Sequence, residues 1–365
     1  DQHSPPTTRG LPIVEQYHGV AVADPYRWLE QTQSPETRNW VAAQNAYTAQ
    51  KLATPSRAAI EKRLLELANY ERWGVPRVHG ERIFYLHNDG LSNHARLFVI
   101  DQPDAAPRPL LDPNTMATDG TMALTNWKVS GDGRYLAYGI SAAGSDTRYW
   151  HLRDVDSGRD LPEVWRCADV VWNADGHSLF YVRHDRQIAG PTDRGRYVLR
   201  LFSHQIGQSI STDRLLYERG DDRPWSLDPR VTEDGHYLIL RISSGMSQLS
   251  QLLYLDLRNP QATVQVLTPA QDAQYTWVGS EGNRFWILTD RGAPRGRIIQ
   301  CDVTAAEVDW ERSWLAESDD LLVAASRCGG RWIVRYLRHA TALVKVFSES
   351  GEWLADVPLP GLRTV

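Results

Sequence analysis

Apolar residues in the first 70 positions recur with the period of an α-helix. Ser34 followed by Pro35 is typical of an N-cap with proline in the first turn, and it predicts a helix that ends near Leu52. Ser56 is placed to cap a second helix that ends near Tyr70. The apolar positions of this second helix are Ile60, Leu64 and Leu67. Residues 1–12 are polar and rich in proline, which predicts a poorly ordered terminus.

After residue 70 the apolar pattern alternates with the period of a β-strand, and one short unit recurs. The unit is a turn that contains glycine, followed by a short apolar strand. Six copies are visible, about 40 to 60 residues apart. They read VHGERIFYLH (78–87), GDGRYLAYGI (131–140), ADGHSLFYVR (174–183), EDGHYLILRI (233–242), EGNRFWILTD (281–290) and CGGRWIVRYL (328–337).

This spacing is typical of four-stranded blades around an axis, so it predicts a mainly β protein with a β-propeller of about six visible blades. The 14 tryptophans and 15 tyrosines suit that fold, because large rings fill the space between stacked blades. One or two β-sandwiches, which also contain many short strands, are the alternative. The last unit stops near Pro358 without a closing strand, so we expect an incomplete ring.

Composition excludes several classes of protein. The net charge is -5 and no basic stripe is present, so we expect no nucleic-acid partner. Apolar runs such as 321–325 fall far short of the about 20 residues of a spanning helix, so we expect no membrane partner. Cys167, Cys301 and Cys328 lack the spacing of a zinc site or a disulfide framework. The first residue is not methionine, which leaves open a cytoplasmic location or a periplasmic or secreted one after signal removal.

No catalytic motif is visible in the chain. A nucleophile elbow reads G-x-S-x-G, and the nearest strings, around Ser178 and Ser209, lack the second glycine. The 11 histidines contain no H-E-x-x-H motif. Residues 131–133 precede a strand rather than a helix, and residues 154–160 lack the glutamate of a calcium loop, so both segments predict turns. We therefore assign no catalytic residue and no metal ligand, and we expect no cofactor.

One segment near the N-terminus is a far more specific sequence signal than any of these strings. YHGVAVADPYRWLE (17–30) closely resembles the N-terminal signature of the prolyl oligopeptidase family. The likeness continues in collinear order through SPETRNWVAAQNAYT (34–48), LLDPNTMATDGTMALTNWKVSGDGRYLAYGISAAGSD (110–146) and WILTDRGAPRGRI (286–298). It covers nearly the whole chain, and residues 17–30 are more similar to proline-specific members than to oligopeptidase B or the acylaminoacyl peptidases.

The resemblance implies a serine peptidase of two domains. A seven-bladed propeller covers an α/β-hydrolase domain, which is built from a short N-terminal and a long C-terminal segment. Residues 1–72 would be the N-terminal hydrolase segment, and residues 73–365 would be the propeller with its last blade missing. The family's serine, aspartate and histidine lie in the C-terminal segment, so we expect this chain to be inactive by itself.

For the intact protein, the resemblance implies cleavage of short peptides after proline, with the propeller as a lid that excludes folded proteins. The implied partners are short proline-containing peptides and the missing C-terminal hydrolase segment, and we expect a monomer when intact. The alternatives are a stand-alone propeller that binds a protein without catalysis, and a split enzyme completed by a second polypeptide. The peptidase is favoured by an apolar surface expected within residues 17–70, at Trp28, Leu29, Trp40 and Val41.

The resemblance also implies four residues at the rim of the substrate pocket. Asp146, in GSD (144–146), matches an aspartate that pairs with a substrate-binding arginine of the hydrolase domain, and a simple loop turn is the alternative. Cys167, Ser226 and Met246 align with positions that line the outer substrate pocket, although their types differ from the family's usual residues there. Packing or exposure is an equal alternative for each of the three. Met246 suits adaptable apolar contacts.

Overall fold

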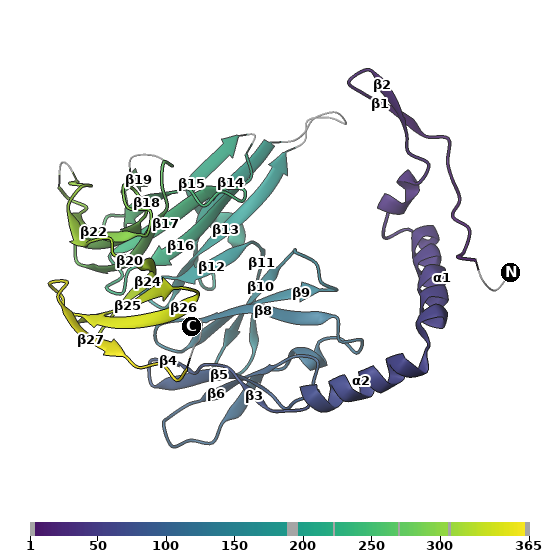
Figure 1. The fold of residues 1–365 in the computed structure, drawn as a ribbon, viewed down its shortest axis with the longest axis horizontal. Coiled ribbons are helices and arrows are strands. Elements are labelled where there is room, and N and C mark those ends of the chain that lie inside the picture. Colours follow the sequence, from purple (N-terminus) through teal and green to yellow (C-terminus); the bar gives the residue numbers. More distant parts are fainter. Residues whose placement is uncertain (1–3, 188–195, 222, 269–270, 306–307, 362–365) are drawn as a thin grey trace. The chain divides into compact units, whose positions relative to one another are not determined.

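The computed structural model describes residues 4–187, 196–221, 223–268, 271–305 and 308–361 (Figure 1). The chain forms two compact units, Asp1–Arg72 with Asn88–Ser92 and Trp73–His87 with Asn93–Val365. The first unit contains a hairpin and two α-helices, and the second contains the bulk of the β-structure.

The first helix begins where the sequence predicts it. α1 (Pro35–Leu52) follows Ser34, whose Oγ accepts a hydrogen bond from the Thr37 backbone N–H at 3.2 Å. Pro35 has no backbone N–H, and the first helical position needs none, so proline costs the helix no hydrogen bond there. The predicted start and end of this helix are confirmed.

The cap predicted for the second helix is wrong. α2 (Pro55–Ala68) is capped by Thr54 and not by Ser56, because Thr54 Oγ1 accepts a hydrogen bond from the Arg57 backbone N–H at 3.2 Å. Pro55 therefore lies inside the helix at its first position instead of separating two helices. The residue before a first-turn proline is the natural cap.

A hairpin precedes the helices, and the sequence pattern does not predict it. β1 (Val14–Tyr17) pairs antiparallel with β2 (Val20–Ala23). The two turn residues, His18 and Gly19, have φ angles of 52° and 81°, as a type I′ turn requires.

The polar segment before this hairpin forms hydrogen bonds with two indoles of the first unit. Trp28 Nε1 donates to the Arg9 carbonyl and Trp40 Nε1 to Thr8 Oγ1, each at 2.9 Å. The segment thereby covers both indoles, and Trp28 is only 9% exposed. The expectation that Trp28 is part of an exposed apolar surface is therefore wrong, and Trp40 is half-buried. Both indoles are covered because their N–H groups donate to residues 8–9. Val41 is exposed as expected.

The described residues after the two helices form six antiparallel sheets, which confirms the predicted propeller blades and excludes the sandwich alternative (Figure 1). Blades 1 to 3 contain β3 (Arg72–Trp73), β4 (Arg77–His79), β5 (Arg82–Asn88), β6 (Arg96–Ile100) and β7 (Arg108–Leu111); β8 (Met122–Val129), β9 (Tyr135–Ala142), β10 (Tyr149–Asp154) and β11 (Asp160–Arg166); β12 (Asp169–Trp172), β13 (Ser178–Gln187), β14 (Arg196–Gln205) and β15 (Arg214–Asp221). Blades 4 to 6 contain β16 (Trp225–Val231), β17 (Tyr237–Ser244), β18 (Ser250–Asp256) and β19 (Gln265–Val266); β20 (Tyr275–Glu281), β21 (Arg284–Thr289), β22 (Arg297–Asp302) and β23 (Ser313–Leu315); β24 (Leu321–Cys328), β25 (Arg331–Arg338), β26 (Thr341–Phe347) and β27 (Trp353–Val357).

The hydrophobic core is divided into clusters that each lie between two successive blades. Alternate side chains of a strand point to opposite faces of its sheet, so one strand serves two clusters. On β17, Leu238 and Leu240 pack toward blade 3, whereas Tyr237 and Ile239 pack toward blade 5. Aromatic rings fill these layers as predicted. The largest fully buried ones are Trp150, Trp332, Tyr237, Tyr275, Phe84 and Phe285.

The recurring glycine units form the turns between the first and second strands of the blades, as predicted. In blade 4, Asp234 Oδ1 accepts hydrogen bonds from Thr232 Oγ1 at 2.6 Å and from the His236 backbone N–H at 3.0 Å. In blade 2, Asp132 accepts equivalent bonds from Ser130 and Arg134. We call the end of the propeller that carries these turns (79–82, 130–135, 173–178, 232–237, 281–284 and 328–331) the turn face.

Turns of neighbouring blades touch each other on the turn face. Gly133 has a φ of 77°, and a Cβ there would lie 2.6 Å from the His79 carbonyl oxygen of blade 1. Gly235 has a φ of 71°, and its Cβ would lie 2.5 Å from Ala174 Cβ of blade 3. Both the backbone conformation and the close approach therefore require glycine at these two positions.

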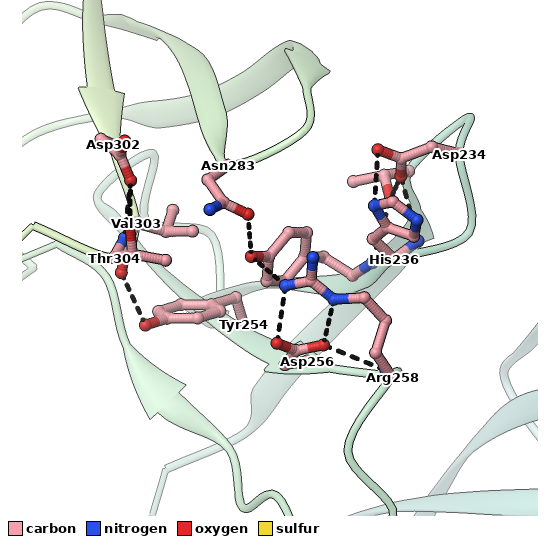
Figure 2. A network of polar contacts seen from close by, with 11 residues as sticks. Asp234, His236, Tyr254, Asp256, Arg258, Asn283, Asp302, Val303 and Thr304 are labelled. Carbon is pink, nitrogen blue, oxygen red and sulfur yellow. Dashed lines mark hydrogen bonds and ion pairs between the residues drawn. The ribbon is translucent and has the colours of Figure 1, made fainter.

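A polar network joins blades 4 and 5 at the turn face (Figure 2). Tyr237 Oη donates to Asn283 Oδ1 and accepts from Arg258 Nη2, both at 2.6 Å. Arg258 is in turn held by the two carboxylate oxygens of Asp256, at 2.9 and 2.7 Å (Figure 2). The Tyr237 side chain is 1% exposed, and its burial raises the pKa of the phenol, which stays a neutral donor.

Candidate functional site

The four candidate pocket residues lie at the end of the propeller opposite the turn face. Strands alternate in direction within a blade, so the loop between its second and third strands emerges at the same end as the connection to the next blade. Asp146 lies in such a loop between β9 and β10, and Met246 lies in the corresponding loop between β17 and β18. Cys167 lies in the connection between β11 and β12, and Ser226 is the second residue of β16, just after another connection. We call this end the connection face.

A pocket of about 300 Å³ opens on the connection face between blades 2 and 3. We call it the blade 2–3 pocket, and its volume suits one or two peptide residues. It brings Asp146 and Cys167 together, whereas Ser226 and Met246 are not part of its lining. The lining residues are Asp146, Thr147, Arg148, Arg166, Cys167, Ala168, Arg183, His184 and Asp185.

Asp146 presents its carboxylate at the mouth of this pocket. Its loop has left-handed backbone at Ala143 and Gly144, with φ angles of 51° and 73°. The Thr147 N–H donates to Ser145 Oγ at 3.1 Å, so the bonds that shape the loop come from its neighbours. Among the residues that the structure describes, none forms a hydrogen bond or ion pair with the exposed Asp146 carboxylate. The carboxylate is therefore available to a partner outside these residues.

Cys167 forms part of the inner wall of the pocket. Its side chain is 6% exposed and packs in the same cluster as Trp150 and Trp165. Burial raises the pKa of the Cys167 thiol well above its ordinary range, and the nearby Asp169 acts in the same direction. The thiol therefore stays protonated and acts as a small apolar group rather than a nucleophile.

Three arginines of the pocket were not predicted from the sequence. Arg166 directly precedes Cys167 and Arg148 follows Asp146 by two positions, so closeness to the predicted residues was the only available signal. Arg183 comes from the neighbouring blade and donates to Asp185 Oδ2 at 3.1 Å. The two blades therefore have to meet before the three guanidinium groups share one pocket.

Ser226 and Met246 lie on the connection face but apart from this pocket. Ser226 is exposed at the start of β16, next to Trp225. The Trp225 carbonyl accepts a hydrogen bond from His184 Nε2 at 3.0 Å, which links this strand to the pocket lining. Met246 is fully exposed, at 100%. Both residues are therefore exposed on the connection face.

Metal and membrane sites receive no support in the described part of the chain. Within the described ranges, no group of three or more His, Cys, Asp or Glu side chains could hold a metal ion. No described helix is long and apolar enough to cross a membrane.

Comparison with known proteins identifies the fold family. The family model of the prolyl oligopeptidase N-terminal beta-propeller domain matches residues 5–365. The chain belongs to the prolyl oligopeptidase family. This confirms the resemblance seen in the sequence.

The curated relatives of this chain include prolyl endopeptidases and prolyl oligopeptidases. The prolyl endopeptidase of Elizabethkingia miricola is 28% identical over 98% of this chain and 51% of its own length. Prolyl oligopeptidase A of Galerina marginata is 30% identical over 92% of this chain and 50% of its own. The chain thus spans about half the length of these relatives and corresponds to their propeller-containing part.

Solved structures of the prolyl oligopeptidase family share the fold. A structure from a study of two prolyl endopeptidases matches with a TM-score of 0.84 and 31% identity, over 98% of this chain and 53% of that one. Prolyl oligopeptidase B from Galerina marginata bound to a 35mer hydrolysis and macrocyclization substrate matches with a TM-score of 0.80 and 22% identity, over 96% of this chain and 53% of that one. At that identity the second match concerns the fold alone.

Proposed function

We propose that this chain is the N-terminal segment and propeller of a serine peptidase that cleaves short peptides after proline. The observation that carries the proposal is the match of 98% of this chain to one half of a prolyl endopeptidase. Residues 1–72 belong to the α/β-hydrolase domain in this proposal, and residues 73–365 form the propeller, whose last blade lies outside this chain.

The chemistry of the proposed enzyme is acyl transfer. A serine activated by histidine attacks the carbonyl that follows proline, and an oxyanion hole stabilises the tetrahedral intermediate. These groups come from the hydrolase segment outside this chain, so the chain contributes no catalytic residue. The propeller acts by exclusion, as a lid that admits short peptides and rejects folded proteins.

The apolar face of α2 supports the hydrolase assignment of residues 1–72. Ile60, Leu64 and Leu67 are 60%, 59% and 56% exposed, although they follow the spacing of a buried helix face. Together with Leu52 and Leu65, two of them border a groove of about 600 Å³. An apolar surface of this kind requires a partner in a soluble protein, and the rest of a hydrolase domain is such a partner.

The exposed carboxylate of Asp146 has a defined role in this proposal. It pairs with an arginine of the hydrolase domain and orients the guanidinium toward substrate. Cys167 contributes an apolar wall, and Ser226 and Met246 contact the bound peptide from the connection face once the hydrolase domain is present. The substrates are short proline-containing peptides, and the intact enzyme is a monomer.

A fluorophosphonate probe tests the proposal, because it labels only an activated serine. The probe is added to protein purified from its source, and the mass of the labelled species is read. Label on a species above 41.4 kDa, or on a co-purifying fragment, is the expected result. A lone, unlabelled chain of 41.4 kDa would instead support a propeller that binds proteins without catalysis.

A further inference from the structure

The blade 2–3 pocket carries more positive charge than its own carboxylates neutralise. Its lining contains three arginines but only two aspartates. Asp185 Oδ2 already accepts from Arg183 Nε at 3.1 Å and from Arg200 Nη1 at 2.6 Å. Asp185 is therefore already paired with two arginines of blade 3 through Oδ2.

Among the residues that the structure describes, the other two arginines have no carboxylate partner. Arg148 donates only to the Ala168 carbonyl, at a long distance of 3.4 Å. In the described ranges the Arg166 guanidinium forms no hydrogen bond or ion pair. Asp146 is the remaining carboxylate of the lining, and within the described ranges it forms no ion pair with either arginine. The proposed function assigns it to an arginine of the hydrolase domain.

The pocket therefore presents two guanidinium groups beside a small apolar wall of Cys167 and Ala168. A guanidinium group binds a carboxylate through two parallel hydrogen bonds. The apolar wall suits the methylene stem that carries such a carboxylate, and the volume of about 300 Å³ suits a single residue with its flanking backbone.

We propose that the blade 2–3 pocket selects peptide substrates that carry a carboxylate away from the cleaved bond, with Arg148 and Arg166 as specificity-determining residues. This inference rests on the proposed peptidase function. The carboxylate is supplied by a glutamate side chain or by the free C-terminus of a short peptide, and the same guanidinium chemistry recognises both.

The test uses the labelled, active peptidase that contains this chain, at low salt, and matched fluorogenic peptides. One series places glutamate or glutamine at each position outside the proline, and a second series has a free or an amidated C-terminus. We expect kcat/KM to be about fivefold higher for the peptide with the carboxylate, mainly through KM, and we expect the preference to shrink in salt. The series that shows the preference identifies the source of the carboxylate.

Arg148→Gln and Arg166→Gln should each reduce this preference, measured as the ratio of kcat/KM for the glutamate peptide to kcat/KM for the glutamine peptide. Arg159→Gln is the matched control, because Arg159 is an exposed arginine in the turn between β10 and β11, at the opposite end of the blade. An equal loss in the control would overturn the inference, because it would show a long-range charge effect. Cleavage of all peptides without a preference would also overturn it, whereas absence of both cleavage and probe labelling would refute the proposed function itself.

Discussion

Replacing Gly235 by alanine tests the contact between the turns of blades 3 and 4, and a control substitution in blade 5 separates this contact from the backbone strain within the turn. A Cβ at Gly235 would lie 2.5 Å from Ala174 Cβ, and the φ of 71° is unfavourable for a side chain. The matched control is Gly282→Ala in the corresponding turn of blade 5. Gly282 has a φ of 54° but nothing within 4 Å of its would-be Cβ, so the control introduces strain without a collision.

The two substitutions should differ by the energy of the collision. Left-handed backbone costs about 1–2 kcal/mol for a residue with a Cβ, and both variants bear this cost. Carbon atoms pack at about 3.5–4.0 Å, so in Gly235→Ala the two blades must separate by roughly 1 Å. Overpacking of this kind costs about 1–3 kcal/mol. We therefore expect Gly235→Ala to destabilise the protein by about 2–5 kcal/mol and Gly282→Ala by about 1–2 kcal/mol.

Thermal unfolding followed by tryptophan fluorescence measures the difference, at about 2–4 °C per kcal/mol for a large domain. A double variant that adds Ala174→Gly removes the opposing methyl group, so it should recover the collision energy in a double-mutant cycle. Equal melting temperatures for Gly235→Ala and Gly282→Ala, or a coupling energy near zero, would refute the account of touching turns.

Three further predictions concern a buried phenol, a half-buried histidine and a helix cap. Tyr237→Phe removes both hydrogen bonds of a buried phenol and should cost about 1–3 kcal/mol in urea unfolding, whereas Tyr254→Phe, which loses one bond of 3.1 Å, should cost about 1 kcal/mol. Burial lowers the pKa of half-buried His151, so the unfolded chain binds its proton more readily and stability falls as pH drops below about 6.5. His151→Gln should lessen the fall in melting temperature between about pH 7.5 and 5.5, and an unchanged fall would contradict this assignment. Ser34→Ala removes the cap of α1, so it should lower the free energy of unfolding by about 1 kcal/mol and weaken the helical circular-dichroism signal. Ser56→Ala lies outside the cap of α2 and should change neither quantity.

The blades were predictable because their signals are local. A glycine turn followed by an apolar strand identifies the hairpin of each blade without knowledge of its neighbours. Ser34 with Pro35 identified α1 in the same way. Ser56 failed as a cap because two hydroxyl residues flank Pro55, and only the proline rule distinguishes Thr54 from Ser56.

The pocket was less predictable because blade-to-blade contacts create it. Asp146 and Cys167 came from resemblance, yet nothing in the pattern around Arg166 distinguishes it from an ordinary exposed strand residue. Its role depends on Arg183 and Asp185, which reach the same pocket only after blades 2 and 3 have packed. The buried pair of His204 Nδ1 and Asp213 Oδ1, 2.7 Å apart, was missed for a similar reason, because polar residues within a strand pattern read as solvent-facing.

The touching turns also restrict how such a ring can change in evolution. A propeller grows when a blade is duplicated, and the copy must place its turn against a backbone carbonyl or a methyl group of a new neighbour. At Gly133 and Gly235 a Cβ would lie 2.6 and 2.5 Å from the neighbouring turn. A copy that had exchanged its glycine for any larger residue could therefore not pack at the same distance from its neighbour. The side chains packed between the blades can change in sequence as long as their total volume is conserved. The glycine turns, in contrast, fix the distance between neighbouring blades.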